Sequence, residues 1–368
     1  MSNNNKTPAI RFKGFTDTWE QREVGELCSI STGKSNTQDK IDDGIYPFYV
    51  RSPIVENSNK YLYDEEAVIT VGDGVGTGKV FHYVNGKYDL HQRCYRMYGF
   101  SEELDAKYFY HTFSLLFYKR VMAMTAKTSV DSVRLEMISD MEIPTPSIDE
   151  QLKIGQLFTN LDTLITLHQR KCDKLIQFKA AMLQKMFPQN GADKPEIRFK
   201  GFTDAWEQRK LEEVITVGNG MDYKHLSEGD IPVYGTGGYM LSVDKALSYD
   251  KDAIGIGRKG TIDKPYVLKA PFWTVDTLFY CIPKEDYSLD FVYCIFQNVN
   301  WKEKDESTGV PSLSKVNINS TDVKVPTLAE QEKIGAYFAQ LDNLITLHQR
   351  KCDKYKSIKA GLIRRLFP

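Results

Sequence analysis

Apolar side chains recur in alternating steps of three and four along two stretches of the chain, residues 148–188 and 328–368. This 3.5-residue period is typical of a coiled coil, so each stretch predicts one long amphipathic helix. At 1.5 Å per residue, about 40 residues make a rod of roughly 60 Å. The predicted seam positions are Ile154, Leu157, Leu161, Leu164, His168, Lys171, Leu175, Phe178 and Met182 in the first rod, and Ile334, Tyr337, Leu341, Leu344, His348, Lys351, Tyr355, Ile358 and Leu362 in the second. Phe158, Ile165, Cys172, Phe338, Ile345 and Cys352 widen these seams.

The two rods are copies of one sequence. They lie 180 residues apart and share the identical segment LITLHQRKCDK. Ser147 with Glu150, and Thr327 with Glu330, have the spacing of a capping box, which predicts where each helix begins.

An apolar stripe of this length needs a partner, and each copy is the obvious partner of the other. Two copies that pack through the same face are related by a two-fold axis, which predicts an antiparallel pair. A parallel homodimer of whole chains would use the same pattern. His168, Lys171, His348 and Lys351 interrupt the seam, where polar residues set register, although the lysines can equally extend to water. No further His or Cys pattern points to a metal or catalytic role for the two histidines.

A second repeat precedes each half of the chain. PAIRFKGFTDTWEQREV and PEIRFKGFTDAWEQRKL, at residues 8–24 and 195–211, are offset by 187 residues and are here called leader 1 and leader 2. The chain is therefore one unit written twice. The expected domains are a leader at 1–19, a globular region at 20–146, a helix at 147–188, a linker with the second leader at 189–206, a second globular region at 207–326 and a helix at 327–368.

The globular regions contain short apolar and aromatic runs separated by Gly, Asp, Asn and Pro, a pattern that favours twisted β cores. The expected strands are Tyr46–Val50, Ala67–Val71, Cys94–Tyr98, Ile231–Tyr234, Ala253–Ile256 and Leu278–Ile282, with helices at Lys107–Val121 and Leu289–Val299. Each region closes on a polar loop, at residues 128–133 and 308–313, and a final strand. The predicted fold class is α+β: two mixed α/β domains joined by two long antiparallel coiled-coil helices, with pseudo-two-fold symmetry.

Composition narrows the class of protein. With 41% hydrophobic and 12% aromatic residues among 368, the chain is an ordinary folded protein, and no apolar run reaches the roughly 18 residues of a membrane span. The N-terminus lacks the apolar core of a signal peptide, so we expect a cytoplasmic protein without a membrane partner. Six cysteines without a C-x-x-C predict reduced thiols rather than a zinc site or disulfides. A net charge of −1 argues against a protein that coats DNA unaided.

The glycine-rich turn GVGTGK at residues 74–79 resembles a phosphate loop but lacks its spacing and its Ser or Thr after the lysine. We interpret it as a tight turn, with nucleotide binding as the alternative. Such turns can present N–H groups or basic side chains to DNA, and ordinary loop solubility explains them equally well. The candidate DNA-binding residues are Lys34, Arg51, Gly76, Thr77, Lys79, Arg93, Arg96, Lys127, Arg134, Lys224, Arg258, Lys259, Thr261, Lys264 and Lys315. Trp273 is interpreted as core rather than as a stacking platform.

The sequence contains no nucleophile elbow, no H-E-x-x-H and no aromatic-flanked N-P-P or D-P-P of an amino-methyltransferase. We therefore predict no catalytic residue and no metal ligand in this chain.

Two divergent globular regions, each followed by a nearly identical helix that opens P-x-x-x-E-Q-x-K-I at residues 146–154 and 326–334, closely resemble the specificity subunit of type I restriction-modification systems. The resemblance covers almost the whole chain. It implies that each globule is a target-recognition domain reading one half of a split, asymmetric site in double-stranded DNA, while the rods set the spacer.

The resemblance also implies partners. Family members bind two methyltransferase (modification) subunits, joined by restriction/translocase subunits. S-adenosylmethionine, ATP and Mg are expected in those partners, and no cofactor in this chain. The alternative is a non-enzymatic coiled-coil scaffold with two ligand-binding β domains.

Overall fold

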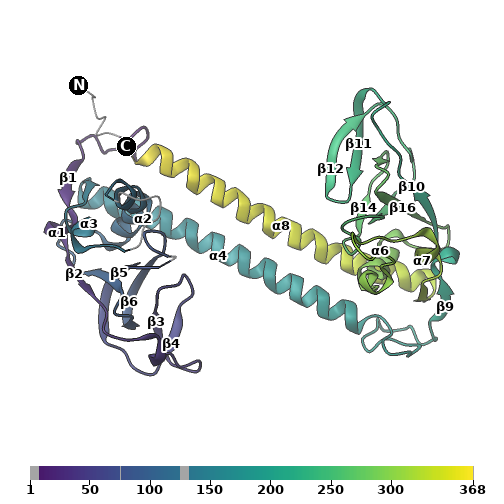
Figure 1. The fold of residues 1–368 in the computed structure, drawn as a ribbon, viewed down its shortest axis with the longest axis horizontal. Coiled ribbons are helices and arrows are strands. Elements are labelled where there is room, and N and C mark those ends of the chain that lie inside the picture. The colour runs from purple at the N-terminus through teal and green to yellow at the C-terminus, as the bar shows by residue number, and fades with distance from the viewer. Residues whose placement is uncertain (1–7, 75, 125–131, 368) are drawn as a thin grey trace. The chain divides into compact units, whose positions relative to one another are not determined.

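The computed structural model describes residues 8–74, 76–124 and 132–367, and the chain divides into two compact units. Unit 1 comprises residues 1–168 and 351–368, and unit 2 comprises residues 169–350. Two long helices, α4 (Ile148–Lys185) and α8 (Leu328–Leu366), each contribute residues to both units (Figure 1).

Unit 1 is built on a six-stranded sheet in the order β2-β7-β5-β6-β3-β4. Its strands are β2 (Ser29–Thr32), β7 (Cys94–Tyr98), β5 (Tyr63–Val71), β6 (Phe81–Leu90), β3 (Tyr46–Tyr49) and β4 (Glu56–Ser58). Helix α2 (Ala106–Ala123) buries Phe109, Phe113 and Phe117, one helical turn apart, in the core beside this sheet. The remaining elements are β1 (Glu20–Glu23), α1 (Val24–Leu27), η1 (Thr37–Asp39), α3 (Leu135–Ser139) and β8 (Glu142–Thr145), with β1 antiparallel to β8.

Unit 2 repeats this strand order in two sheets, β10-β16-β13-β14 and β12-β11-β15. Its strands are β10 (Ile215–Asn219), β16 (Leu278–Pro283), β13 (Ala253–Gly257), β14 (Tyr266–Leu268), β15 (Trp273–Thr274), β11 (Glu228–Gly235) and β12 (Gly238–Val243). Its other elements are β9 (Glu207–Lys210), α5 (Leu211–Val214), α6 (Leu289–Asn298), η2 (Trp301–Lys304), α7 (Lys315–Asn319) and β17 (Asp322–Val325). Strands β14 and β15 together take the place of β6.

The expected strands and helices all appear within a few residues of their predicted bounds, which confirms the α+β class. Strand β6 was not predicted. Its Asn85-Gly86 pair has the composition of a turn, yet the strand continues through it because Gly86 adopts a φ of 122° that other residues disfavour. Trp273 lies in the core, and its Nε1 donates to Met221 O at 2.9 Å.

The two long helices pack antiparallel within each unit, as the repeat predicts. In unit 1, Lys359 near the end of α8 donates to both carboxylate oxygens of Asp162 in the first half of α4, at 2.6 and 2.8 Å. In unit 2, Lys179 of α4 makes the equivalent bonds to Asp342 of α8, at 2.6 and 2.7 Å. These lysines, which were not predicted seam residues, fix the register of the pair.

The predicted seam packs at every second position, and between these positions the residues predicted to widen it are buried more deeply than the predicted seam residues, as at Phe158, Cys172, Phe338 and Cys352. Ile154, Leu161 and His168 are buried as expected, and His168 stacks on Tyr355 with ring centroids 5.6 Å apart. In α4 the line continues through the buried Phe158, Cys172 and Lys179 and the half-buried Ile165. In α8 it runs through the buried Ile334, Phe338, Leu341 and Cys352 and the half-buried Ile345, His348, Tyr355 and Lys359. The predicted seam residues that are half-buried include Leu157, Leu164, Leu175, Met182, Tyr337 and Leu362, and those that are exposed are Lys171, Phe178, Leu344, Lys351 and Ile358. Both lines have the same 3.5-residue period, so periodicity could not distinguish them.

The helices begin directly after Ser147 and Thr327, as the capping-box spacing predicts, but the role predicted for Glu150 is wrong because its carboxylate binds leader 1. Its buried carboxylate accepts bonds from Arg11 Nε at 2.9 Å, from Arg11 Nη2 at 2.6 Å and from Trp19 Nε1 at 3.1 Å. A buried charge is stabilised more by a bidentate guanidinium than by a backbone N–H. Arg198 makes the same bidentate bond to Glu330 in unit 2, with both distances 2.7 Å.

The rest of the shared E-Q-x-K-I opening joins each rod to its globule. Gln151 accepts from the Asp105 N–H at 3.0 Å and donates to Pro146 O at 2.8 Å, beside the N-cap of α2. A Cβ added to Gly155 would lie 2.7 Å from Asp105 Oδ1 and 2.9 Å from Tyr108 N, so only glycine permits this approach. The repeated sequence therefore has a structural explanation inside the chain.

Candidate nucleic-acid interface

Both units bring the same two loops together at one end of the sheet. In unit 1, Val133 N–H, in the closing loop, donates to Gly72 O at 2.7 Å, just after β5. In unit 2, Leu313 N–H donates to Arg258 O at 3.0 Å, just after β13. Isolated bridges Asp73–Ser132 and Lys259–Ser312 extend the two pairings. Asp73 and Lys259 therefore occupy the same backbone position.

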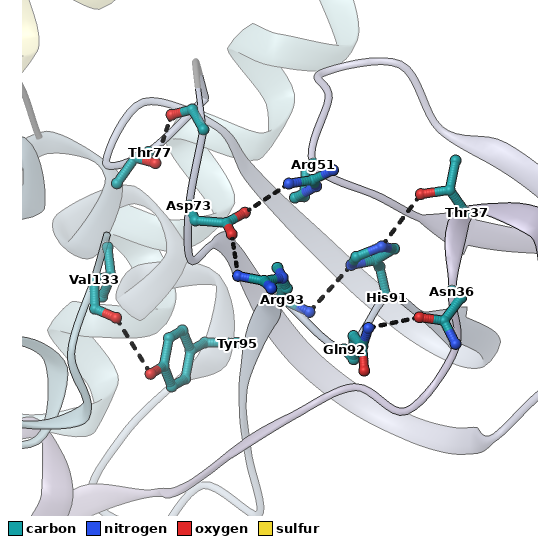
Figure 2. A network of polar contacts seen from close by, with 11 residues as sticks. Asn36, Thr37, Arg51, Asp73, Thr77, His91, Gln92, Arg93, Tyr95 and Val133 are labelled. Atoms are coloured by element: carbon teal, nitrogen blue, oxygen red, sulfur yellow. Dashed lines mark hydrogen bonds and ion pairs between the residues drawn. The ribbon is translucent and has the colours of Figure 1, made fainter. Parts of the chain in front are cut away.

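In unit 1 this position is the centre of a charged group that we call the Asp73 cluster, formed by Arg51, Asp73 and Arg93 (Figure 2). Arg51 Nη1 donates to Asp73 Oδ1 at 3.2 Å, and Arg93 Nη1 donates to Oδ2 at 2.7 Å. The arginine side chains are 45% and 61% exposed, whereas that of Asp73 is 17% exposed. The cluster thus presents two oriented guanidinium groups at the surface.

A buried histidine, His91, hydrogen-bonds to the backbone of the Asp73 cluster. His91 Nδ1 accepts from the Arg93 backbone N–H at 3.1 Å, and Nε2 lies 3.3 Å from Thr37 Oγ1. Burial, followed by the charge of Arg51, lowers the pKa of His91, which favours the neutral ring that this acceptor role requires. Beside it, Gln92 Nε2 donates to Asn36 Oδ1 at 2.5 Å (Figure 2). The sequence analysis did not identify Asp73, His91, Gln92 or Asn36 as site residues, because an isolated polar residue forms no recognisable sequence pattern.

The glycine-rich turn does not form a phosphate loop. Backbone N–H groups of Thr77 and Lys79 are already bonded to Gly74 O and Gly76 O, at 3.1 and 3.0 Å. The Thr77 hydroxyl also donates to Gly74 O, at 2.6 Å, and both Gly76 and Thr77 are buried. Lys79 is exposed, with Nζ 5.0 Å from the centre of the Tyr118 ring. Of the predicted turn residues, only Lys79 is available to a ligand.

Arg96, another candidate, is buried and bonded within unit 1. Its guanidinium lies between the rings of Tyr63 and Tyr98, at 3.8 and 3.7 Å, and it forms an ion pair with Glu65. Arg96 Nε donates to Ser31 Oγ at 2.9 Å. The other unit 1 candidates, Lys34 and Arg134, are exposed, and Lys127 lies outside the described residues.

In unit 2 the candidates gather around a shallow hollow of about 370 Å³. Its polar lining is Asn219, Arg258, Lys259, Ser312, Ser314 and Lys315. Thr261 and Lys264 line a neighbouring hollow of about 540 Å³, while Lys224 lies by a third, beside β11 and β12. The structure thus brings three of the six unit 2 candidates, Arg258, Lys259 and Lys315, to the position that the Asp73 cluster occupies in unit 1.

The described residues contain no group of three or more metal-binding side chains, and their helices include none long and apolar enough to cross a membrane. All six cysteines are buried thiols, as predicted. Burial raises the pKa of Cys28 and of Cys94 to about 12, so neither thiol is a reactive nucleophile at neutral pH.

Residues 16–177 and 203–356 match the family described as "Type I restriction modification DNA specificity domain". The specificity subunit of the type I restriction enzyme MjaVIII from Methanocaldococcus jannaschii is 21% identical, over 95% of this chain and 92% of its own length. The EcoDI specificity subunit from Escherichia coli is 24% identical, over 88% and 81%. In fold, the chain is similar to the crystal structure of the type I S subunit from M. genitalium, with a TM-score of 0.79, 17% identity and coverage of 98% and 99%.

Proposed function

The chain belongs to the type I restriction modification DNA specificity family, a non-catalytic family, and from this premise we propose that each unit reads one half of a bipartite, asymmetric DNA site. Two copies of one architecture in a single chain supply two reading surfaces. Because the surfaces differ in charge and shape, the two half-sites differ in sequence.

The observation that carries this proposal is a shared backbone with exchanged side chains. Val71 pairs with Cys94 in unit 1 as Gly257 pairs with Leu278 in unit 2. The next residue but one is Asp73 in unit 1 and Lys259 in unit 2, with opposite charges at one position. Sequence is read by side chains at base edges, so equivalent frames with different side chains suit two different half-sites.

The helices α4 and α8 set the distance between half-sites, because each contributes to both units and their register is fixed by Lys179–Asp342 and Lys359–Asp162. Seven residues lengthen a helix by about 10.5 Å, the rise of about three base pairs. A heptad inserted after His168 and another after Arg350 would keep the contacts within each unit and lengthen the spacer by about three base pairs.

Partner subunits supply the chemistry and much of the DNA affinity. Residues 20–145 contain 14 Lys and Arg against 19 Asp and Glu, and residues 207–325 contain 14 against 18. Neither globule therefore attracts phosphates strongly by itself. In this proposal the repeated leaders and rods dock two modification subunits, which carry S-adenosylmethionine, and restriction subunits add ATP- and Mg-dependent cleavage.

The test is to express the chain with its modification subunits and to map the methylated sites. A bipartite site is expected, with the unit 1 variant Arg51→Ala changing one half, the unit 2 variant Lys259→Ala changing the other half, and the paired heptad insertion changing only the spacer. A continuous site, or variants in one unit that alter both halves, would refute the proposal. Tight, sequence-selective binding by the chain alone would refute the shared-affinity part.

A further inference from the structure

We propose that Arg51 and Arg93 read guanine in the half-site of unit 1, and that Asp73 is the residue that positions both. This inference rests on the proposed function and assigns it to particular side chains. It also separates Asp73, a positioning residue, from the two arginines that would contact the bases.

The first step is the hydrogen-bonding capacity of the arginines. Each one uses a single nitrogen, Nη1, on the Asp73 carboxylate. The Nη2 and Nε groups of both side chains have no acceptor among the described residues. Guanine presents the acceptors O6 and N7 side by side in the major groove, and a planar guanidinium edge binds both at once.

The second step is the sign of the central charge. A site for phosphate gains nothing from a carboxylate at its centre, because Asp73 repels an anion. At a base edge the same carboxylate does no harm and limits each arginine to one orientation. Ordering these long side chains before binding lowers the conformational entropy lost on the DNA. The Asp73 cluster therefore fits a groove edge better than a phosphate.

The third step is the comparison with unit 2, which forms the same fold without the ion pairs of the Asp73 cluster. Gly72 N–H donates to Arg93 O at 2.8 Å, and Arg258 N–H donates to Thr277 O at 2.8 Å. Arg93 therefore corresponds to Thr277. Tyr49 pairs with Leu90 as Tyr234 pairs with Thr274, so the residues two positions further on, Arg51 and Thr236, also correspond.

Unit 2 thus forms the same loops with threonines in place of both arginines and a lysine in place of the aspartate. An ion-pair bridge that served only to hold loops together would be required in both units. Its presence in unit 1 alone indicates a role in what unit 1 recognises.

The experiment uses the full chain in complex with its modification subunits and measures methylation of oligonucleotides with all four bases at each position of both half-sites. Wild type should require guanine at positions in the half read by unit 1. Arg51→Ala and Arg93→Ala should each relax a guanine preference at least tenfold, at different positions. Asp73→Asn should relax both preferences together, and Asp73→Glu should restore them in part.

Lys119→Ala is the control, since Lys119 of α2 is an exposed basic residue of unit 1 that lies outside the cluster and outside the candidate DNA-binding residues. It should leave every base preference unchanged. Thermal unfolding of each variant checks that the unit remains folded, and Arg51→Lys, which keeps the charge but not the fork, should lose guanine preference as Arg51→Ala does.

The inference is overturned if Arg51→Ala and Arg93→Ala leave the half-site unchanged while the site remains bipartite. It is also overturned if Asp73→Asn lowers methylation of all sequences equally, with a reduced salt dependence, because that is the behaviour of a phosphate contact. A site that is not bipartite, or a change in the half read by unit 2, would instead contradict the proposed function.

Discussion

Replacing Arg11 with alanine should destabilise unit 1 more than replacing any other charged residue of leader 1. Its guanidinium donates two hydrogen bonds to the Glu150 carboxylate, at 2.9 and 2.6 Å, and one to Asp17 O, at 2.7 Å. The Glu150 side chain is only 1% exposed. Arg11→Ala would leave that carboxylate with Trp19 Nε1, at 3.1 Å, as its remaining side-chain donor among the described residues. A neutral N–H does not offset a buried charge.

The expected loss follows from the desolvation of the stranded carboxylate. Breaking a buried ion pair by removing one partner costs about 3–5 kcal/mol, whereas removing both charges costs far less. Arg11→Ala should therefore lower the free energy of unfolding by about 3–5 kcal/mol. Adding Glu150→Gln to that variant removes the charge while keeping an oxygen for Trp19, so the double variant should be more stable than Arg11→Ala alone.

Urea unfolding, monitored by hydrogen exchange, measures the loss of unfolding free energy separately in each unit. Arg198→Ala is the matched variant in unit 2, where Glu330 pairs with Arg198 and Trp206 Nε1 has no hydrogen-bond partner among the described residues. It should cost at least as much as Arg11→Ala. A loss below about 1 kcal/mol for Arg11→Ala, the range of an exposed ion pair, would refute the reasoning. A double variant no more stable than the single one would refute it as well.

Gly155→Ala should destabilise unit 1, because the added Cβ would clash with Asp105 and Tyr108. Gly361→Ala places its Cβ in open space on α8 and should stabilise unit 1 by about 1 kcal/mol. Urea unfolding compares the two variants, and equal effects would contradict the steric argument. Burial, followed by the charge of Lys359, lowers the pKa of His111 to about 4. The unfolded chain, with a histidine pKa near 6.5, therefore takes up the proton first as pH falls, and unit 1 should lose about 3 kcal/mol between pH 6.5 and 4. His111→Cys, which copies Cys294 of unit 2, should abolish that share of the pH dependence of unfolding, and an unchanged slope would show that His111 is not its source.

Much of the architecture was predictable because its signals are local. The 3.5-residue period, the 180-residue repeat and the alternation of apolar runs with Gly and Asn predicted the rods, the duplication and most strands. These features depend on helix and strand geometry, which a few consecutive residues determine. The candidate basic residues were chosen by residue type alone, so the sequence could not distinguish Arg51 and Arg93 from Arg96.

Tertiary structure decided which of these residues meet. It chose the line through Phe158 over the line through Leu157, paired Glu150 with Arg11 across 139 residues, and buried Arg96 between two tyrosines while leaving Arg51 and Arg93 exposed on Asp73. The physical reason is that periodicity specifies the spacing of a face but not its partner. Burial and charge pairing depend on groups distant in sequence, whose positions only the folded chain defines.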